Sequence, residues 1–245
     1  MKIEEITPQR LEELAQRAYE RDYPVFSPFL NLSEISTLKG LKLPVSYTLF
    51  GGYNCFERAV AGFGNEVKNK DFPIVCICIE PLSKKFSDSL SHRDFLGSLM
   101  NLGISRSTLG DIAVKDNTGY LFCLESIADY ITENLSRVKH TSVKCERIKD
   151  VPDFINALPE SEEIIVTSLR ADAVISSVYR LSRAEASRLF KDGKVFVNSK
   201  QLTKDSAALK ENDIVSVRGH GKFIFDSTLR KTKKDREVIS VRIYK

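Results

Sequence analysis

The sequence predicts an α+β protein built from more than one domain. Two observations lead to this prediction: amphipathic helices and short apolar strands alternate along the chain, and the order of these elements changes from one third to the next. A chain of 245 residues can hold one to three domains with cores of their own. We expect an N-terminal α/β region at residues 1–70, a second domain at 71–150 and a third at 165–245.

The N-terminal region begins with an amphipathic helix over Pro8–Arg21. Leu11, Leu14 and Ala18 recur at helical spacing, so they should share one buried face.

A pair of glycines, Gly51-Gly52, lies between two apolar segments rich in aromatic residues. Tyr47–Phe50 and Tyr53–Phe56 flank the pair, and a two-residue turn would join them as a β-hairpin. The aromatic side chains could stack on nucleic-acid bases. Their alternation along the segments favours core packing instead.

The middle region, residues 71–150, has the most regular order of elements. Pro73–Ile79 is an apolar run typical of a strand buried on both faces. Ser91–Leu102 is a helix that Ser91 and Asp94 cap and that Gly103 ends. The later elements are the strands Asp111–Lys115 and Tyr120–Leu124, the helix Ile127–Leu135 and the strand Ser142–Ile148. This β-α-β-β-α-β order predicts a ferredoxin-like plait.

The plait raises the possibility of an RNA-recognition surface made of aromatic side chains on its central strands. Tyr120 and Phe122 alternate on the third strand as such a surface requires. The first strand carries no aromatic residue, however, and the basic, glycine-containing signature around the third strand is incomplete. A plait that serves as a scaffold, or that uses its loops, fits these residues better.

Two short helices open the C-terminal region. Ser182 and Glu185 form a capping box at the start of the second helix, and Gly193 supplies the left-handed residue that ends it. The expected buried face of this helix holds Ala186, Leu189 and Phe190.

Cations recur at points of this region that could face one common surface. Arg183, Arg188 and Lys191 lie on the helix arc opposite the apolar face. Lys194 precedes the next strand, and Lys200 ends the Asn-Ser turn that follows it. A solvated helix face would also explain such residues, so their spacing and the distribution of charge decide between the two interpretations.

Charge is distributed unevenly along the chain. Residues 168–245 hold 18 Lys and Arg against 9 Asp and Glu, a net charge of +9. Residues 1–167 hold 19 Lys and Arg against 24 Asp and Glu, a net charge of −5. A localised positive segment is the electrostatic footprint of nucleic-acid binding. An anionic membrane could use the same charge, but no long apolar run or lipidation signal accompanies it.

The C-terminal segment resembles the S4 RNA-binding domain. The resemblance rests on Arg-x-Asp at Arg170, Ser-Arg at Ser182, Gly-Lys-Val-x-Val-Asn from Gly193 and Asp-x-Val at residues 213–215. It implies an αL-type domain that binds structured RNA.

Over nearly its full length the chain is similar to the YlmH-type S4-domain RNA-binding proteins, which are associated with cell-division gene clusters of Gram-positive bacteria. The similarity is carried by FGGY and ER within residues 50–58, LSHRDFLGSL at 90–99, GDI at 110–112, IADYI at 127–131 and VRGHGKF at 217–223. It implies an N-terminal region, a plait and an S4 domain. It also implies binding to rRNA of the large ribosomal subunit, to tRNA, or to both, in the rescue of stalled translation.

The predicted RNA contacts combine the S4 positions with neighbouring cations. Arg183 and Lys191 would grip phosphates, and Asn198 would reach from its turn toward the RNA backbone or base edges. The full set is Arg170, Ser182, Arg183, Arg188, Lys191, Lys194, Asn198, Lys200, Arg218 and Lys222.

The remaining composition is that of a cytoplasmic protein. No apolar run approaches the length of a membrane span, and the N-terminal residues are too polar for a signal peptide. Its five cysteines are scattered, and Cys76-Ile77-Cys78 has no second pair at a metal-like spacing. We therefore expect reduced thiols and no metal or organic cofactor.

Two other functions stay open from the residues. An S4-containing RNA-modifying enzyme would need a catalytic group, and His92 with Asp94 is the best polar candidate. Neighbouring helix residues point in different directions, however, and Asp94 has a capping role available, so we expect no catalysis. An adaptor that links RNA or the ribosome to a division factor would use the plait as its docking surface.

Overall fold

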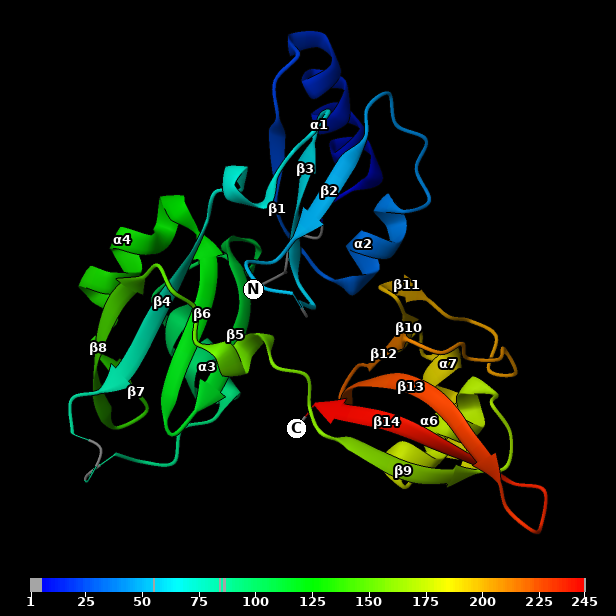
Figure 1. Cartoon of the computed structure of the whole chain (residues 1–245). Helices are drawn as coiled ribbons and strands as arrows, with labels where there is room; N and C mark the ends of the chain where they lie inside the picture. The colour runs from blue at the N-terminus through cyan, green and yellow to red at the C-terminus, as the bar shows by residue number, and fades with distance from the viewer. Residues whose placement is uncertain (1–5, 55, 84, 86, 245) are drawn as a thin grey trace. The chain divides into compact units, whose positions relative to one another are not determined.

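The computed structural model describes the chain apart from residues 1–5, 55, 84, 86 and 245 (Figure 1). Its contacts divide the chain into two compact units, Met1–Asn156 and Ala157–Lys245. Helices and antiparallel sheets occur in both units, which confirms the predicted α+β class. The finer division of the first unit near residue 70 stays a prediction.

The first unit begins with a three-stranded sheet in the order β1-β3-β2, with α1 and α2 packed against β1. Thr7 caps α1 by accepting a 3.2 Å hydrogen bond from the Arg10 N–H. The predicted stripe of Leu11, Leu14 and Ala18 is confirmed, since all three are buried. The elements are α1 (Pro8–Arg21), β1 (Val25–Leu30), α2 (Leu32–Leu38), β2 (Tyr47–Phe50) and β3 (Ala59–Phe63).

The predicted hairpin around Gly51-Gly52 is wrong. Strand β2 pairs antiparallel with β3, with Phe50 opposite Val60, so residues 51–58 form the connection and the expected second strand is absent from its described part. Gly52 has a φ of +95°, and a Cβ on it would lie 2.3 Å from the Phe122 ring. Glycine at this position therefore allows the backbone to pack closely against the plait. From the sequence alone, such a glycine cannot be distinguished from one that forms a tight turn.

The plait follows in the order β5-β6-β4-β8-β7, with antiparallel neighbours throughout (Figure 1). Its β-α-β-β-α-β core confirms the ferredoxin-like prediction, and α3 and α4 bury one face of the sheet. The two-residue strand β7, which forms a hairpin with β8, was not predicted. The elements are β4 (Ile74–Pro81), α3 (His92–Asn101), β5 (Leu109–Lys115), β6 (Thr118–Leu124), α4 (Glu125–Asn134), β7 (Arg137–Val138) and β8 (Thr141–Ile148). Short helical turns precede β4 (Asn69–Asp71) and β5 (Arg106–Thr108), and α5 (Asp153–Asn156) ends the unit.

The second unit packs two helices on one face of a six-stranded antiparallel sheet in the order β11-β10-β12-β13-β14-β9. Its core contains the predicted face of the second helix, with Ala186, Leu189 and Phe190 all buried. The elements are β9 (Ser161–Val166), α6 (Ala171–Tyr179), α7 (Arg183–Lys191), β10 (Val195–Val197), β11 (Lys200–Gln201), β12 (Asp213–Val217), β13 (Gly221–Lys231) and β14 (Glu237–Tyr244).

Replacement of Gly52 by alanine should destabilise the first unit. The new Cβ would overlap the Phe122 ring and force a strained left-handed residue, at a cost of about 2–4 kcal/mol in the free energy of unfolding. Urea denaturation followed by circular dichroism measures this loss of stability, because the chain has no tryptophan whose fluorescence could be followed. Gly97→Ala is the matched control: it lies mid-helix with nothing within 4 Å of a Cβ, so it should gain about 0.5–1 kcal/mol. Equal stabilities for both variants would contradict the packing argument.

Candidate nucleic-acid interface

The predicted contact residues all lie in the second unit, and most of them are at its surface. Lys194 is half-buried and Lys222 is 7% exposed. The Lys222 ammonium lies 4.3 Å from the centroid of the Tyr244 ring, so this side chain packs against β14 rather than toward solvent. The exposed members are Arg170, Ser182, Arg183, Arg188, Lys191, Asn198, Lys200 and Arg218.

Helix α7 is fixed at both ends by the residues that the sequence predicted. Ser182 Oγ accepts the Glu185 N–H at 3.2 Å, and the Glu185 carboxylate accepts the Ser182 N–H at 2.8 Å. The hydrogen bonds from the Ser182 side chain and backbone lower the pKa of Glu185. Gly193 has a φ of +65° and ends the helix. The capping box therefore sets where the cations of α7 lie.

Near the C-terminal end of α7, Asp192 gathers cations from two elements. Its Oδ2 lies 3.3 Å from Lys194 Nζ and 3.9 Å from Arg188 Nε. The Arg218 N–H donates a 2.9 Å hydrogen bond to the Lys194 carbonyl, which places β12 beside this point. The Arg218 guanidinium lies 5.0 Å from the centroid of the Phe196 ring.

A second carboxylate, Asp205, joins the start of α6 to α7. It accepts a 2.6 Å hydrogen bond from the Ser187 hydroxyl, and this bond lowers its pKa, with further lowering by the charges of Arg170 and Lys191. Arg170 also makes a bidentate pair with Asp172, at 3.0 and 2.9 Å. We give the name basic cluster to the four cations near these two carboxylates together with Arg218, which lies over Phe196: Arg170, Arg188, Lys191, Lys194 and Arg218.

The other predicted contacts lie outside the basic cluster. Arg183, the first residue of α7, donates a 3.0 Å hydrogen bond to the Thr167 hydroxyl. The Asn198 side chain bonds to the start of β12: its amide donates to Asp213 at 2.8 Å and its oxygen accepts the Ile214 N–H at 3.0 Å. Asn198 and Ser199 have φ values of +50° and +61°, as a tight hairpin turn requires.

Other residues of the same chain cover the aromatic side chains on the sheet face of the plait. Phe122 is 1% exposed and stacks on Tyr53, with ring centroids 5.0 Å apart and planes 20° apart. Tyr120 meets Phe154 edge to face at 5.4 Å. These contacts confirm the core-packing interpretation of the aromatic residues, because nucleic-acid bases cannot stack where the rings are already covered.

The motif residues around this contact form a hydrogen-bonded network. The Asp111 carboxylate accepts the Tyr53 hydroxyl at 3.0 Å and the Glu57 N–H at 2.7 Å. Arg58 donates to the carbonyls of Leu109 at 2.9 Å, of Phe29 at 3.0 Å and of Arg106 at 3.1 Å. Burial lowers the pKa of Arg58, and burial together with the nearby Arg58 charge lowers that of Arg106 to about 10. The Arg106 guanidinium therefore stays charged at neutral pH.

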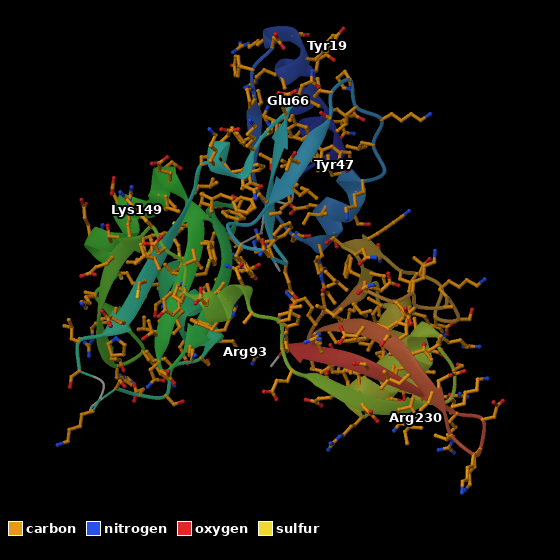
Figure 2. The ribbon with its side chains drawn as sticks, viewed as in Figure 1. Tyr19, Tyr47, Glu66, Arg93, Lys149 and Arg230 are labelled. Atoms are coloured by element: carbon orange, nitrogen blue, oxygen red, sulfur yellow. The ribbon has the colours of Figure 1, made fainter. Side chains whose placement is uncertain are left out.

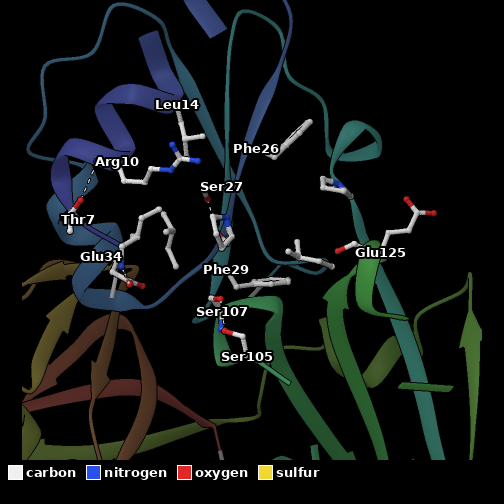
Figure 3. Close-up of a pocket in the computed structure, with 16 residues that line it drawn as sticks. Thr7, Arg10, Leu14, Phe26, Ser27, Phe29, Glu34, Ser105, Ser107 and Glu125 are labelled. Carbon is white, nitrogen blue, oxygen red and sulfur yellow. Dashed lines mark hydrogen bonds between the residues drawn. The ribbon is translucent and has the colours of Figure 1, made fainter. Parts of the chain in front are cut away.

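A cavity of the first unit with a volume of about 1060 Å³ lies between β1, α1 and the start of α4. Figure 3 shows Arg10 and Glu34 on the side of α1 and α2, and Glu125 on the side of α4. Glu34 accepts the N–H groups of Ile6 and Asn31 at 2.8 and 2.6 Å, and Arg10 pairs with Glu13 at 2.8 Å. These charged groups already serve helix capping and surface pairing.

The other candidate reactive groups are also structural. Asp94 accepts the N–H and hydroxyl of Ser91 at 2.8 and 2.7 Å, which confirms its capping role, and no hydrogen bond joins it to His92 in the described chain. Burial raises the pKa of the Cys76, Cys123 and Cys145 thiols to about 12. Among the described residues, no group of three or more His, Cys, Asp or Glu side chains could hold a metal ion.

The fold and this surface define a two-unit α+β protein with a covered plait and an exposed basic cluster. A family model described as "Putative RNA-binding domain in YlmH" matches residues 68–151. The chain is 33% identical over 197 residues to the Ribosome-associated protein quality control protein P2 of Bacillus subtilis (strain 168), which covers 78% of this chain and 76% of that protein.

A solved structure, the Cell division protein ylmH from Streptococcus pneumoniae, matches with a TM-score of 0.45 and 21% identity, over 57% of this chain and 87% of that one. The chain belongs to the YlmH family, as the identity to the Bacillus subtilis relative shows. No helix among the described residues is long and apolar enough to cross a membrane.

Replacement of Arg58 by lysine should destabilise the first unit by about 2 kcal/mol. Lysine keeps the charge but cannot donate to three carbonyls with the geometry of a guanidinium, so buried acceptors lose their partners. Thermal and urea denaturation measure the loss. Arg10→Lys is the control, since its pair with Glu13 is exposed and contributes about 0.5 kcal/mol or less. Wild-type stability of the Arg58 variant would contradict the network's structural role.

Proposed function

We propose that the chain is a non-catalytic RNA-binding protein that works on the ribosome in the cytoplasm. In this proposal residues 165–245 are an S4 domain that binds structured RNA, either rRNA of the large subunit, tRNA, or both. The biological role is ribosome-associated quality control, in which stalled translation is rescued. The name of the Bacillus subtilis relative and the description of the family model support the ribosome and RNA parts of the proposal.

The observation that carries the proposal is the basic cluster. Arg188 of α7 and Lys194 before β10 pair with Asp192, and Arg170 before α6 and Lys191 of α7 lie near Asp205. Arg218 follows β12, and the segment has a net charge of +9. The ion pairs with Asp192 orient Arg188 and Lys194, and the segment keeps its excess positive charge. Guanidinium and ammonium groups are the side chains that pair with the phosphates of RNA.

Catalysis is not part of the proposal. Among the described residues, no hydrogen bond joins His92 to Asp94, the pair that an RNA-modifying enzyme would use, and Asp94 is held in a helix cap. RNA recovered after incubation with the protein should therefore have the same mass as RNA that was incubated without it. A mass change that disappears on replacement of His92 or Asp94 would favour the enzyme instead.

A charge-neutralising triple variant, Arg188→Gln, Lys191→Gln and Arg218→Gln, tests the basic cluster. It should weaken binding of a labelled RNA hairpin roughly tenfold or more and should reduce the salt slope of log K by about 2–3, since each lost phosphate contact contributes about 0.7–0.9. Fluorescence anisotropy across a salt series measures both quantities.

The matched control for that experiment removes the same charge from the same unit. Lys210→Gln, Lys233→Gln and Lys234→Gln lie outside the basic cluster, at exposed positions. Figure 2 shows the neighbouring Arg230 toward the projecting end of the β13–β14 hairpin. RNA binding should change little in this control. An equal loss in both triple variants, or a salt slope that stays flat in the wild type, would contradict the proposal.

A further inference from the structure

The helix side of the plait carries a groove that the proposed S4 surface does not use. It has a volume of about 480 Å³ and runs along α3, with β7 and the last residues of α4 as its other wall. Its cations are Arg93 of α3, Arg137 of β7 and Lys139 of the β7–β8 turn. All three are exposed. The volume is that of a ligand site, for which about 300–1,000 Å³ is usual.

The charge of the groove is positive. Asp94 is the acidic group of the lining, and it is held by the Ser91 N–H and hydroxyl and lies 3.6 Å from Lys139 Nζ. In the described chain, Arg93 and Arg137 have no carboxylate within ion-pair distance, so the groove keeps excess positive charge. Ser98, Asn101 and Asn134 add hydroxyl and amide groups along the same wall.

Gly97 lies in the middle of α3 and lines the groove. A Cβ at this position would meet nothing within 4 Å, so packing does not require glycine here. The residue also has an ordinary helical φ, and glycine is a poor helix former. Because Gly97 has no side chain, the helix backbone is exposed at this point and the groove stays open to a ligand.

We propose that this groove binds the sugar-phosphate backbone of RNA, as a second contact separate from the S4 surface. The identity of the ligand as RNA rests on the proposed function. The cations would pair with phosphates, and the hydroxyl and amide groups would bond to ribose hydroxyls. None of the described residues that line the groove is aromatic, so it would hold the backbone without stacking bases.

The closed sheet face supports this assignment. The family model covers residues 68–151, which form the plait, and the aromatic face of that plait is buried under Tyr53 and Phe154. A nucleic acid that contacts the plait must therefore use another face. Residues 90–99, whose pattern is part of the resemblance to the family, supply Arg93, Gly97 and Ser98 to the groove. Two sites on one chain would also raise the overall affinity by acting together.

Two variants of the full chain test the groove. Gly97→Gln places a long side chain in the groove without changing charge and with better helix propensity. Arg93→Gln, Arg137→Gln and Lys139→Gln together remove the cations. With a fluorescein-labelled RNA hairpin carrying a single-stranded extension as the probe, each variant should weaken binding roughly tenfold, and the triple should reduce the salt slope by about 2.

The control triple Lys144→Gln, Arg147→Gln and Lys149→Gln removes the same charge from the plait outside the groove. Strand β8 puts its full length, about 26 Å, between the β7–β8 turn and Lys149. Figure 2 shows Lys149 and Arg93 at opposite sides of the plait. Circular dichroism should show wild-type folding for all variants. Wild-type RNA affinity of Gly97→Gln, or an equal loss in the control triple, would overturn the proposal.

Combination with the basic-cluster triple separates this inference from the proposed function. If the cluster variant alone removes RNA binding and the groove variants change nothing, the groove proposal fails and the S4 proposal stands. If the groove variants weaken RNA binding and the cluster variant does not, the groove proposal stands and the S4 proposal fails. A groove triple that keeps RNA affinity but loses affinity for a poly-glutamate peptide would show a protein-binding groove and overturn the RNA assignment.

Discussion

The stacking of Tyr53 on Phe122, fixed by the Asp111 carboxylate, is the contact on which the arrangement of the first unit depends. It closes the sheet face of the plait with residues from the N-terminal region, and Arg58 ties the same region to the carbonyls of residues 106 and 109. A plait closed in this way cannot offer its aromatic strands to bases. The helix side of the plait and the second unit remain open to a polyanion.

The second unit organises its cations with a few carboxylates instead of leaving them dispersed. Asp192 pairs with Arg188 of α7 and with Lys194 before β10, and Asp205 accepts a hydrogen bond from Ser187 of α7 near the charges of Arg170 and Lys191. The packing of α6 on α7 and of β10 on β12 therefore brings these groups together. Exposed pairs of this kind add little to stability, but they limit the conformations of long side chains. Preordered cations lose less entropy when they meet phosphates, which is an advantage for binding rather than for folding.

Local signals in the sequence predicted most of the elements. The Ser182–Glu185 capping box, Gly193 and the Asn198-Ser199 turn depend on neighbours within a few residues, and the structure contains all three. The order of the plait followed from hydrophobic periodicity in the same way. The prediction of a hairpin at Gly51-Gly52 was wrong because Gly52 packs closely against the Phe122 ring, some seventy residues away in sequence. Burial of Lys222 against Tyr244 and the role of Asp111 also depend on distant partners, which no local pattern encodes.

The site was predictable in part for the same reason. Cations on α7 could be placed on one helix arc from their spacing, whereas the carboxylates that gather them come from loops. The most direct test of the account is ultraviolet crosslinking of the full chain to RNA, with the crosslinked peptides mapped by mass spectrometry. The account predicts crosslinks in residues 183–200 and none at Tyr120 or Phe122. Crosslinks on those two rings, with none on α7, would contradict it.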